Sequence, residues 1–368
     1  MSAENSITHE VALAQKSEAD LKDISNLNQL WQTEFKAGRS QLYKPDGSIN
    51  HYALENFRRY NILLHEMGPE TDFANWNPKY WYKLFFSNPF KSTKQFLRQR
   101  INGQLRGNKM TMLKMFDTLE TLGVDKILRK HDASQTPGNP FVYRHKGCVF
   151  NTRWLRYAYF VFLAQKYLKQ DINESPRRFV SLDLGCNFGG FSYFFKSEFP
   201  KTTQILVDLP DQIVLADYFL RNKFKDAKIA TYLDIRKLEK IDRQFVEKFD
   251  FVLIPITQYD KLMPDVADMY TNFDSLGEMM RPWFEYYMKS AAFKGVKIFM
   301  TTNRFVSSPA HEPTHGNDLT IWDYKLDQFN HILFDVNPIL TLYSKIHHKY
   351  FYSIESFSSQ FFDFIGKK

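Results

Sequence analysis

The sequence has little cysteine and no long apolar run. Its 368 residues include two cysteines, Cys148 and Cys186, which are too few for a disulfide framework. The most apolar helical stretch, 154–168, is interrupted by Arg156 and Lys166 and is shorter than the ~20 residues that a bilayer crossing needs. The first residues also lack the basic and then apolar layout of a signal peptide. We therefore expect a cytoplasmic protein without a transmembrane segment, and peripheral membrane contact stays open.

Acidic residues are outnumbered by basic ones, 41 to 49, which gives a formal net charge of +8. This balance favours an anionic partner, such as a nucleotide-linked sugar, a lipid phosphate, a membrane surface or nucleic acid. One basic stretch lacks a helix-turn-helix or zinc-finger layout, so we interpret it as a solvated helix face and do not expect nucleic acid as the partner. It comprises Lys91, Lys94, Arg98, Arg100, Arg106 and Lys109.

The chain divides into three parts. Residues 1–26 are polar, with no sustained apolar period, and predict a loosely ordered terminus. Residues 27–175 show mainly helical spacing of apolar positions, with a turn at 136–140 and a helix at about 151–168. Residues 176–368 alternate β-branched or aromatic runs with helical patterns, which is typical of a parallel sheet with crossover helices. We expect an α/β fold with a Rossmann-like catalytic part and a helical domain before it.

The candidate strands outnumber those of a seven-stranded sheet by one. Either 229–233 or 249–256 is therefore expected to be an insertion or an edge element. The last two runs lie close together without a crossover helix between them, so the sheet is expected to end in an antiparallel pair. The candidate strands are 178–183, 204–208, 229–233, 249–256, 266–272, 296–302, 331–336 and 349–354.

A glycine-rich turn follows the first of these strands. Its residues of interest are Asp183, Gly185, Cys186, Asn187 and Gly189. A dinucleotide fingerprint needs glycine where Asn187 stands, and no Gly-Lys-Ser/Thr follows for a phosphate-binding loop. The remaining common ligand is S-adenosylmethionine, whose zwitterionic methionine end would meet Asp183, the loop amides and Asn187 without a phosphate to accommodate.

A second acid supports this interpretation. Asp208 ends the next strand and is placed to accept hydrogen bonds from both ribose hydroxyls. The alternative is a turn or a helix cap before Pro210. Adenine would be contacted by Asp234 if 229–233 precedes the adenine loop, or by Gln258 if 249–256 does; the sequence leaves both open.

Several motifs stand between residues 136 and 340. They are Gly138-Asn-Pro140, Asp183-Leu-Gly-Cys-Asn-Phe-Gly-Gly, Val207-Asp-Leu-Pro210 with Ala216-Asp-Tyr-Phe-Leu220, Asp268 to Met279, and Thr302-Asn-Arg304. Together they resemble a family of sugar O-methyltransferases from bacterial glycan clusters. The resemblance implies a class I, seven-stranded methyltransferase that uses S-adenosylmethionine, and a sugar hydroxyl of a glycan or glycan precursor as the acceptor, which could carry phosphate. A protein, RNA or other small-molecule acceptor, and a cofactor-binding module without turnover, stay open as alternatives.

A sugar hydroxyl is a poor nucleophile and needs a general base or a metal ion. Among the polar residues expected near the carboxyl ends of the strands we favour Glu278 and His315, together with Asn272, and consider Asn303 and His311 as further candidates.

Glu278 has a structural alternative, because Ser275-x-x-Glu278 matches a helix capping box. His311, Glu312, His315 and Asp318 match no defined metal motif, so no metal ion is predicted.

Overall fold

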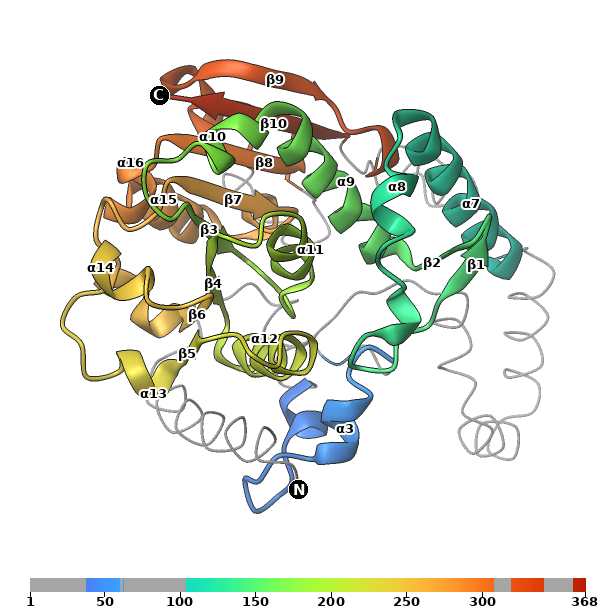
Figure 1. Cartoon of the computed structure of the whole chain (residues 1–368), viewed down its shortest axis with the longest axis horizontal. Coiled ribbons are helices and arrows are strands. Elements are labelled where there is room, and N and C mark those ends of the chain that lie inside the picture. The colour runs from blue at the N-terminus through green and yellow to red at the C-terminus, as the bar shows by residue number, and fades with distance from the viewer. Residues whose placement is uncertain (1–37, 60–61, 63–103, 308–318, 341–359) are drawn as a thin grey trace.

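The computed structural model describes most of the chain from its middle to its end and a short part of its beginning (Figure 1). The described residues are 38–59, 62, 104–307, 319–340 and 360–368, with side chains of the helix at 104–122 described from residue 111. Three predictions lie outside these residues: the polar terminus 1–26, the candidate strand 349–354 and the loop that carries His311 and His315. The side chains of the basic stretch 91–109 lie outside them as well.

The part before the sheet is mainly helical, with one small hairpin. Its elements are α3 (His51–Glu55), α7 (Gln104–Leu122), α8 (Asp125–Leu128), a 3-10 helix (Ala133–Gln135), β1 (Tyr143–His145), β2 (Cys148–Phe150), α9 (Thr152–Tyr167) and α10 (Lys169–Asn173). The helix predicted at 151–168 is confirmed as α9. No helix among the described residues is long and apolar enough to cross a membrane.

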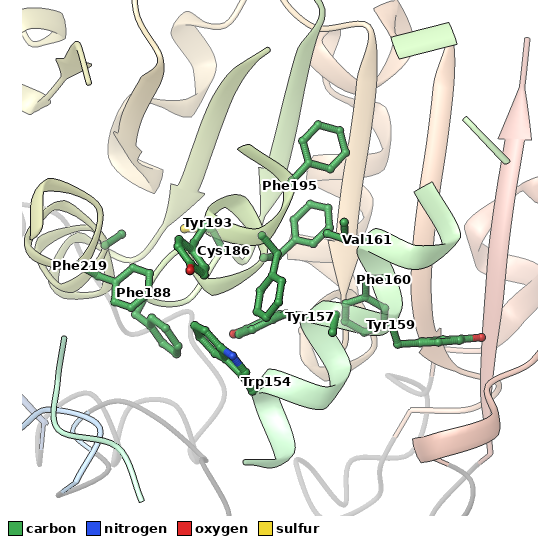
Figure 2. Close-up of a cluster of buried hydrophobic side chains, with 14 of the residues drawn as sticks. Trp154, Tyr157, Tyr159, Phe160, Val161, Cys186, Phe188, Tyr193, Phe195 and Phe219 are labelled. Carbon is green, nitrogen blue, oxygen red and sulfur yellow. The ribbon is translucent and has the colours of Figure 1, made fainter. Parts of the chain in front are cut away.

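Helix α9 is the element that joins this part to the sheet. The Asn151 side chain caps its start by accepting from the Trp154 amide at 3.0 Å. Ten of its side chains are buried, on all sides of the helix, which is the pattern of a helix packed inside a protein. Figure 2 shows Trp154 and Tyr157 of this helix beside Phe188 of the glycine-rich turn, with Phe219 on the far side of Phe188. The helical part and one face of the sheet therefore share a single hydrophobic core.

Within the described residues the main sheet has eight strands, in the order β5-β6-β4-β3-β7-β8-β10-β9. The pairs from β5 to β8 are parallel, whereas β10 pairs antiparallel with both β8 and β9. The expected α/β fold with a mainly parallel sheet and an antiparallel end is thus confirmed. The strands are β3 (Val180–Leu184), β4 (Thr203–Asp208), β5 (Ile229–Ala230), β6 (Phe251–Pro255), β7 (Met269–Phe273), β8 (Ile298–Arg304), β9 (Asn330–Val336) and β10 (Phe361–Lys367).

Two strand predictions need correction. The candidate strand 229–233 is only the two-residue edge strand β5, because Thr231 ends it by capping the next helix. The partner of β9 in the antiparallel pair is β10, a segment that the sequence pattern did not indicate. Six of the seven β10 residues are buried, so the segment lacks the alternation of polar and apolar residues that marks a half-exposed strand.

Helices cover both faces of the sheet (Figure 1). Helices α11 and α12 pack with α9 on one face, and α13 to α16 border the other. The sheet accordingly lies between two hydrophobic layers. The helices are α11 (Gly190–Glu198), α12 (Pro210–Lys223), α13 (Tyr232–Ile235), α14 (Arg243–Val246), α15 (Arg281–Lys289) and α16 (Ala291–Gly295).

A buried hydrogen bond joins α9 to β10, which lies between β8 and the edge strand β9. The Tyr159 hydroxyl donates to Asp363 Oδ2 at 2.7 Å, and burial raises the pKa of Asp363 to about 6. At pH 8 the carboxyl is ionised, so Tyr159→Phe should remove a charge-assisted bond and lower the free energy of unfolding by about 2 kcal/mol. Tyr167→Phe, near the end of the same helix, should change it by less than about 0.5 kcal/mol. Equal losses in urea denaturation of the two variants would contradict this role of Tyr159.

Candidate functional site

The glycine-rich loop leaves the carboxyl end of β3 and turns sharply into α11. Gly185, Asn187 and Gly189 all have positive φ, at 75°, 55° and 80°. The Gly185 amide donates to Val207 O at 2.8 Å, which holds the loop against β4. The amides of Asn187, Phe188 and Gly189 are also donated within the protein, so the loop is held in a fixed shape. Helix α11 begins directly after it, and the amides of a first helical turn can bind an anionic or polar ligand group.

Asp208, at the end of β4, joins this loop to the next one. Its Oδ2 accepts from the Asn187 amide at 2.6 Å and its Oδ1 from the Leu209 amide at 2.7 Å. The alternative interpretation as a helix cap is wrong, because the N-cap of α12 is Leu209 and no side chain caps that helix. Asp208 instead fixes the loops at the carboxyl ends of two neighbouring parallel strands, which is where such sheets bind ligands.

Asp183 is a second acid beside it. The Thr271 hydroxyl donates to Asp183 Oδ1 at 2.9 Å, and the carboxyl is 2% exposed. Burial, with the nearby charge of Asp208, raises the pKa of Asp183 to about 8, and burial raises that of Asp208 to about 7. Within the described residues no ion pair reaches either carboxyl group. Two such acids favour a ligand that brings positive charge or hydrogen-bond donors.

Cys186 contributes to the loop through its backbone. Its side chain is 2% exposed, and burial raises the pKa of the thiol above its usual value. The thiol is therefore protonated at neutral pH and unreactive.

Asn272, in β7, is fully buried and bonded through both ends of its amide. Its Nδ2 donates to Leu184 O and to Ser275 Oγ, each at 2.7 Å. Its Oδ1 accepts from the Leu276 amide at 3.0 Å and from Asn303 Nδ2 at 2.8 Å. The side chain thus fixes the start of the 3-10 helix Leu276–Glu278, and a direct catalytic role for it stays a prediction.

The capping box expected at Ser275 is not formed. Ser275 makes no side-chain bond that caps the 3-10 helix, because its hydroxyl accepts from Asn272. The Glu278 carboxylate lies instead 3.5 Å from Arg304 Nη2 at the end of β8. This removes the structural alternative that the sequence offered for Glu278.

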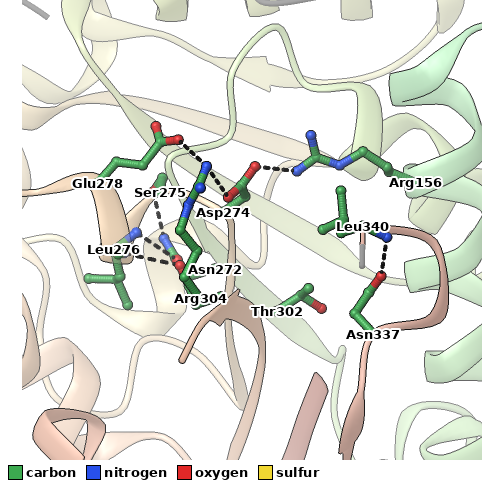
Figure 3. A network of polar contacts seen from close by, with 12 residues as sticks. Arg156, Asn272, Asp274, Ser275, Leu276, Glu278, Thr302, Arg304, Asn337 and Leu340 are labelled. Carbon is green, nitrogen blue, oxygen red and sulfur yellow. Dashed lines mark hydrogen bonds and ion pairs between the residues drawn. The ribbon is translucent and has the colours of Figure 1, made fainter. Parts of the chain in front are cut away.

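Glu278 belongs to a cluster of four charged side chains at the carboxyl ends of β7 and β8 (Figure 3). Arg304 Nη2 also lies 3.8 Å from Asp274 Oδ1, and Arg156 of α9 lies 2.8 Å from Asp274 Oδ2. Burial and the charge of Asp274 raise the pKa of Glu278 above its usual range. A carboxylate of raised pKa in a polar cluster is suited to accept a proton near neutral pH.

The sequence pattern assigns no role to Arg156, which interrupts an apolar stretch, or to Asp274, which lies inside the motif from 268 to 279. An arginine within the mostly apolar helix α9 is the signal that could have found this pair, since a buried cation needs an acidic partner.

The two adenine candidates lie at different distances from Asp208 in the sheet. Gln258 is 5% exposed on the 3-10 helix Ile256–Lys261, which follows β6, and β6 pairs with β4 so that Pro255 faces Asp208. Asp234 follows the edge strand β5, which β6 separates from β4. Its Oδ2 accepts from the Thr231 amide at 2.7 Å as part of a capping box. Of the two candidates, Gln258 is therefore the one that follows the strand paired with the strand of Asp208.

The loop residues of the site prediction are not covered. His311, Glu312, His315 and Asp318 lie outside the described residues. In the described part of the chain, no group of three or more His, Cys, Asp or Glu side chains could hold a metal ion.

Comparisons with known proteins give remote likenesses. No family model and no curated protein matches the chain. Mitomycin 7-O-methyltransferase aligns at 11% identity over 59% of this chain and 57% of its own, with a TM-score of 0.32. Geranyl diphosphate methyltransferase, solved with GPP and sinefungin, aligns at 12% over 58% and 82% with a TM-score of 0.36. M. jannaschii TYW2, solved with AdoMet, aligns at 11% over 62% and 86% with a TM-score of 0.31.

The close contact at Gly185 yields a test of the loop. A Cβ at Gly185 would lie 2.2 Å from Ser275 Oγ, whereas a Cβ at Gly123, which also has positive φ, meets nothing within 4 Å. Both substitutions to alanine cost about 1 kcal/mol of backbone strain, but only Gly185→Ala displaces Ser275 and its bond to Asn272. We expect Gly185→Ala to lower the melting temperature by several degrees more than Gly123→Ala. Equal melting temperatures would mean that the loop is not tightly fitted against Ser275.

Proposed function

We propose that the protein is an S-adenosylmethionine-dependent methyltransferase. The observation that carries the proposal is the pair of acids at the ends of neighbouring parallel strands, the buried Asp183 and the partly buried Asp208, beside a loop of positive φ. A cationic ligand with a ribose would satisfy both acids, and Asn187 in place of the glycine that the dinucleotide fingerprint needs argues against a dinucleotide.

The residues present fit this cofactor by the chemistry of their donors and acceptors. Asp208 would accept from the ribose hydroxyls, and Asp183 would accept from the amino group of the methionine end. Gln258 would contact adenine in preference to Asp234, because it follows the strand that neighbours Asp208. When bound, the cofactor supplies a methyl group on a sulfonium, which becomes a neutral thioether as the bond to the acceptor oxygen replaces the bond to sulfur.

We further propose that the acceptor is a sugar hydroxyl and that Glu278 takes its proton. The elevated pKa of Glu278 supports a role as general base, and Asn272 would act by holding the 3-10 helix that carries Glu278. The sugar assignment rests on the resemblance of the segment 268–279 to sugar O-methyltransferases. The arginines around Glu278 suit an acceptor that carries a phosphate.

The first test is calorimetric titration of the protein with S-adenosylmethionine and S-adenosylhomocysteine. The wild type should bind both at micromolar concentration, and Asp208→Ala should bind at least about 100-fold more weakly, because two charge-assisted hydrogen bonds are lost.

Asp234→Ala is the matched control, since Asp234 also accepts from a backbone amide but lies beyond β6. It should leave the affinity within about threefold of the wild type. No binding by the wild type, or equal losses in both variants, would refute the assignment of the cofactor site.

The second test uses the titration of Asp183. Its pKa of about 8 means that the carboxyl gains its charge as the pH rises, so affinity for the cationic cofactor should rise from pH 6 to 9. Asp183→Asn keeps an oxygen for the Thr271 hydroxyl and removes the charge. The affinity ratio of wild type to variant should therefore grow by about tenfold or more over this range. Because titration of the ligand affects both proteins equally, a constant ratio would exclude Asp183 from the site.

The acceptor is then found by methyl transfer. Cofactor labelled in its methyl group is incubated with nucleotide-linked sugars, free sugars, a protein extract and RNA in parallel. Label in an alkali-stable ether of a sugar supports the proposal. Label only in protein or RNA refutes the sugar acceptor but still supports the assignment as a methyltransferase.

A further inference from the structure

Helix α9 is fixed against the end of β7 by two contacts one turn apart. The Phe160 ring stacks on Phe273 with centroids 4.0 Å apart and planes at 8°. Arg156, four residues earlier on the same face, lies 2.8 Å from Asp274, the residue after Phe273. Asp274 has a φ of 60°, so the chain turns there and aims its carboxylate at the helix. A residue of the amino-terminal part thereby becomes a member of the charged cluster around Glu278.

The two acids of the cluster share one arginine. Arg304 Nη2 lies 3.5 Å from Glu278 Oε1 and 3.8 Å from Asp274 Oδ1. The four side chains are between 12% and 16% exposed, so their charges are poorly screened by solvent. Each charge in the cluster accordingly affects the protonation of the others.

We propose that Arg156 and Asp274 are positioning residues that set the proton affinity of Glu278, the base of the proposed reaction. The inference rests on the proposed function. Asp274 places a negative charge near Glu278. It also contacts Arg304, the arginine that contacts Glu278. Arg156 offsets much of that charge from α9. Docking of α9 thus determines whether Glu278 can exist as the carboxylate that accepts the hydroxyl proton.

The surroundings of Glu278 fix the sign of each change. The charged and titratable groups that act on it are Asp274 after β7, Arg304 of β8, Arg156 and Arg153 of α9, and Tyr324 of the 3-10 helix Ile321–Tyr324. Removal of the Asp274 charge lowers the pKa of Glu278, because a like charge that opposes ionisation is lost. Removal of the Arg156 charge raises it, because an opposite charge is lost.

The experiment measures this pKa directly and needs no acceptor. The protein is labelled with ¹³C at the glutamate side-chain carboxyl, and the Glu278 signal is identified as the one missing from Glu278→Gln. Its chemical shift is followed from about pH 4 to 9 in the wild type, Asp274→Asn and Arg156→Gln. Asparagine tolerates the positive φ at 274, so Asp274→Asn should fold. Asp274→Ser is the second variant at this position. Lys166→Gln removes the same charge from the far end of α9 and serves as the control.

We expect Asp274→Asn to lower the pKa of Glu278 by at least about 0.5 and Arg156→Gln to raise it by at least as much. Lys166→Gln should leave it unchanged. A merely structural role would not produce shifts of opposite sign. Shifts of the same sign, shifts in neither variant, or an equal shift in Lys166→Gln overturn the proposal.

Titration of the same proteins with S-adenosylmethionine separates this proposal from the proposed function. Both positions lie outside the proposed cofactor contacts, so the variants should bind the cofactor within about threefold of the wild type. A wild type that binds no cofactor but shows the opposite shifts would refute the methyltransferase assignment and leave the coupling of Arg156, Asp274 and Glu278 established.

Discussion

The close packing of helix α9 on the glycine-rich loop is the constraint on which the rest of the site depends. A Cβ at Gly190 would lie 2.2 Å from the Tyr157 ring, so the helix approaches the loop to a distance that only glycine allows. Tyr159 and Phe160, on the next turn, reach β10 and the end of β7. One helix therefore fixes the loop, the sheet and the charged cluster relative to each other. The helical part and one face of the sheet share buried side chains, so they form one hydrophobic core.

The site is built at a cost in electrostatic free energy. Asp183 is buried and Asp208 partly buried, and neither has an ion-pair partner in the described part of the chain. Their raised pKa values reflect the free-energy cost of ionising them there. Burial also raises the pKa of Glu278, and the nearby positive charges of Arg304 and Arg156 limit this rise. Protein interiors tolerate such acids where a ligand or a reacting proton relieves them, which is why their position agrees with a binding site rather than with a structural network.

The sequence predicted the parallel core well and the edges of the sheet poorly. Strands β3, β4, β6 and β8 contain β-branched or other apolar residues followed by turn or helix signals, so the sequence pattern indicated them. Strand β5 has only two residues because Thr231 caps the next helix with Asp234, which is a local effect. Strand β10 carries the buried Asp363, which accepts a hydrogen bond from the distant Tyr159. Local sequence patterns do not indicate contacts between distant residues.

By itself, the sequence determined the fold class, the loop from Asp183 to Gly189 and the acid at 208. These depend on local torsions and on apolar periodicity, which are properties of short segments. Only the tertiary structure decided that Gln258 follows the strand beside Asp208, that Ser275 caps nothing, and that Arg156 belongs with Asp274 and Glu278. Arg156 and Asp274 are 118 residues apart, and the contact between them exists because α9 buries its apolar surface on the sheet. Hydrophobic burial brings these charged side chains together in space, and no local sequence pattern predicts that contact.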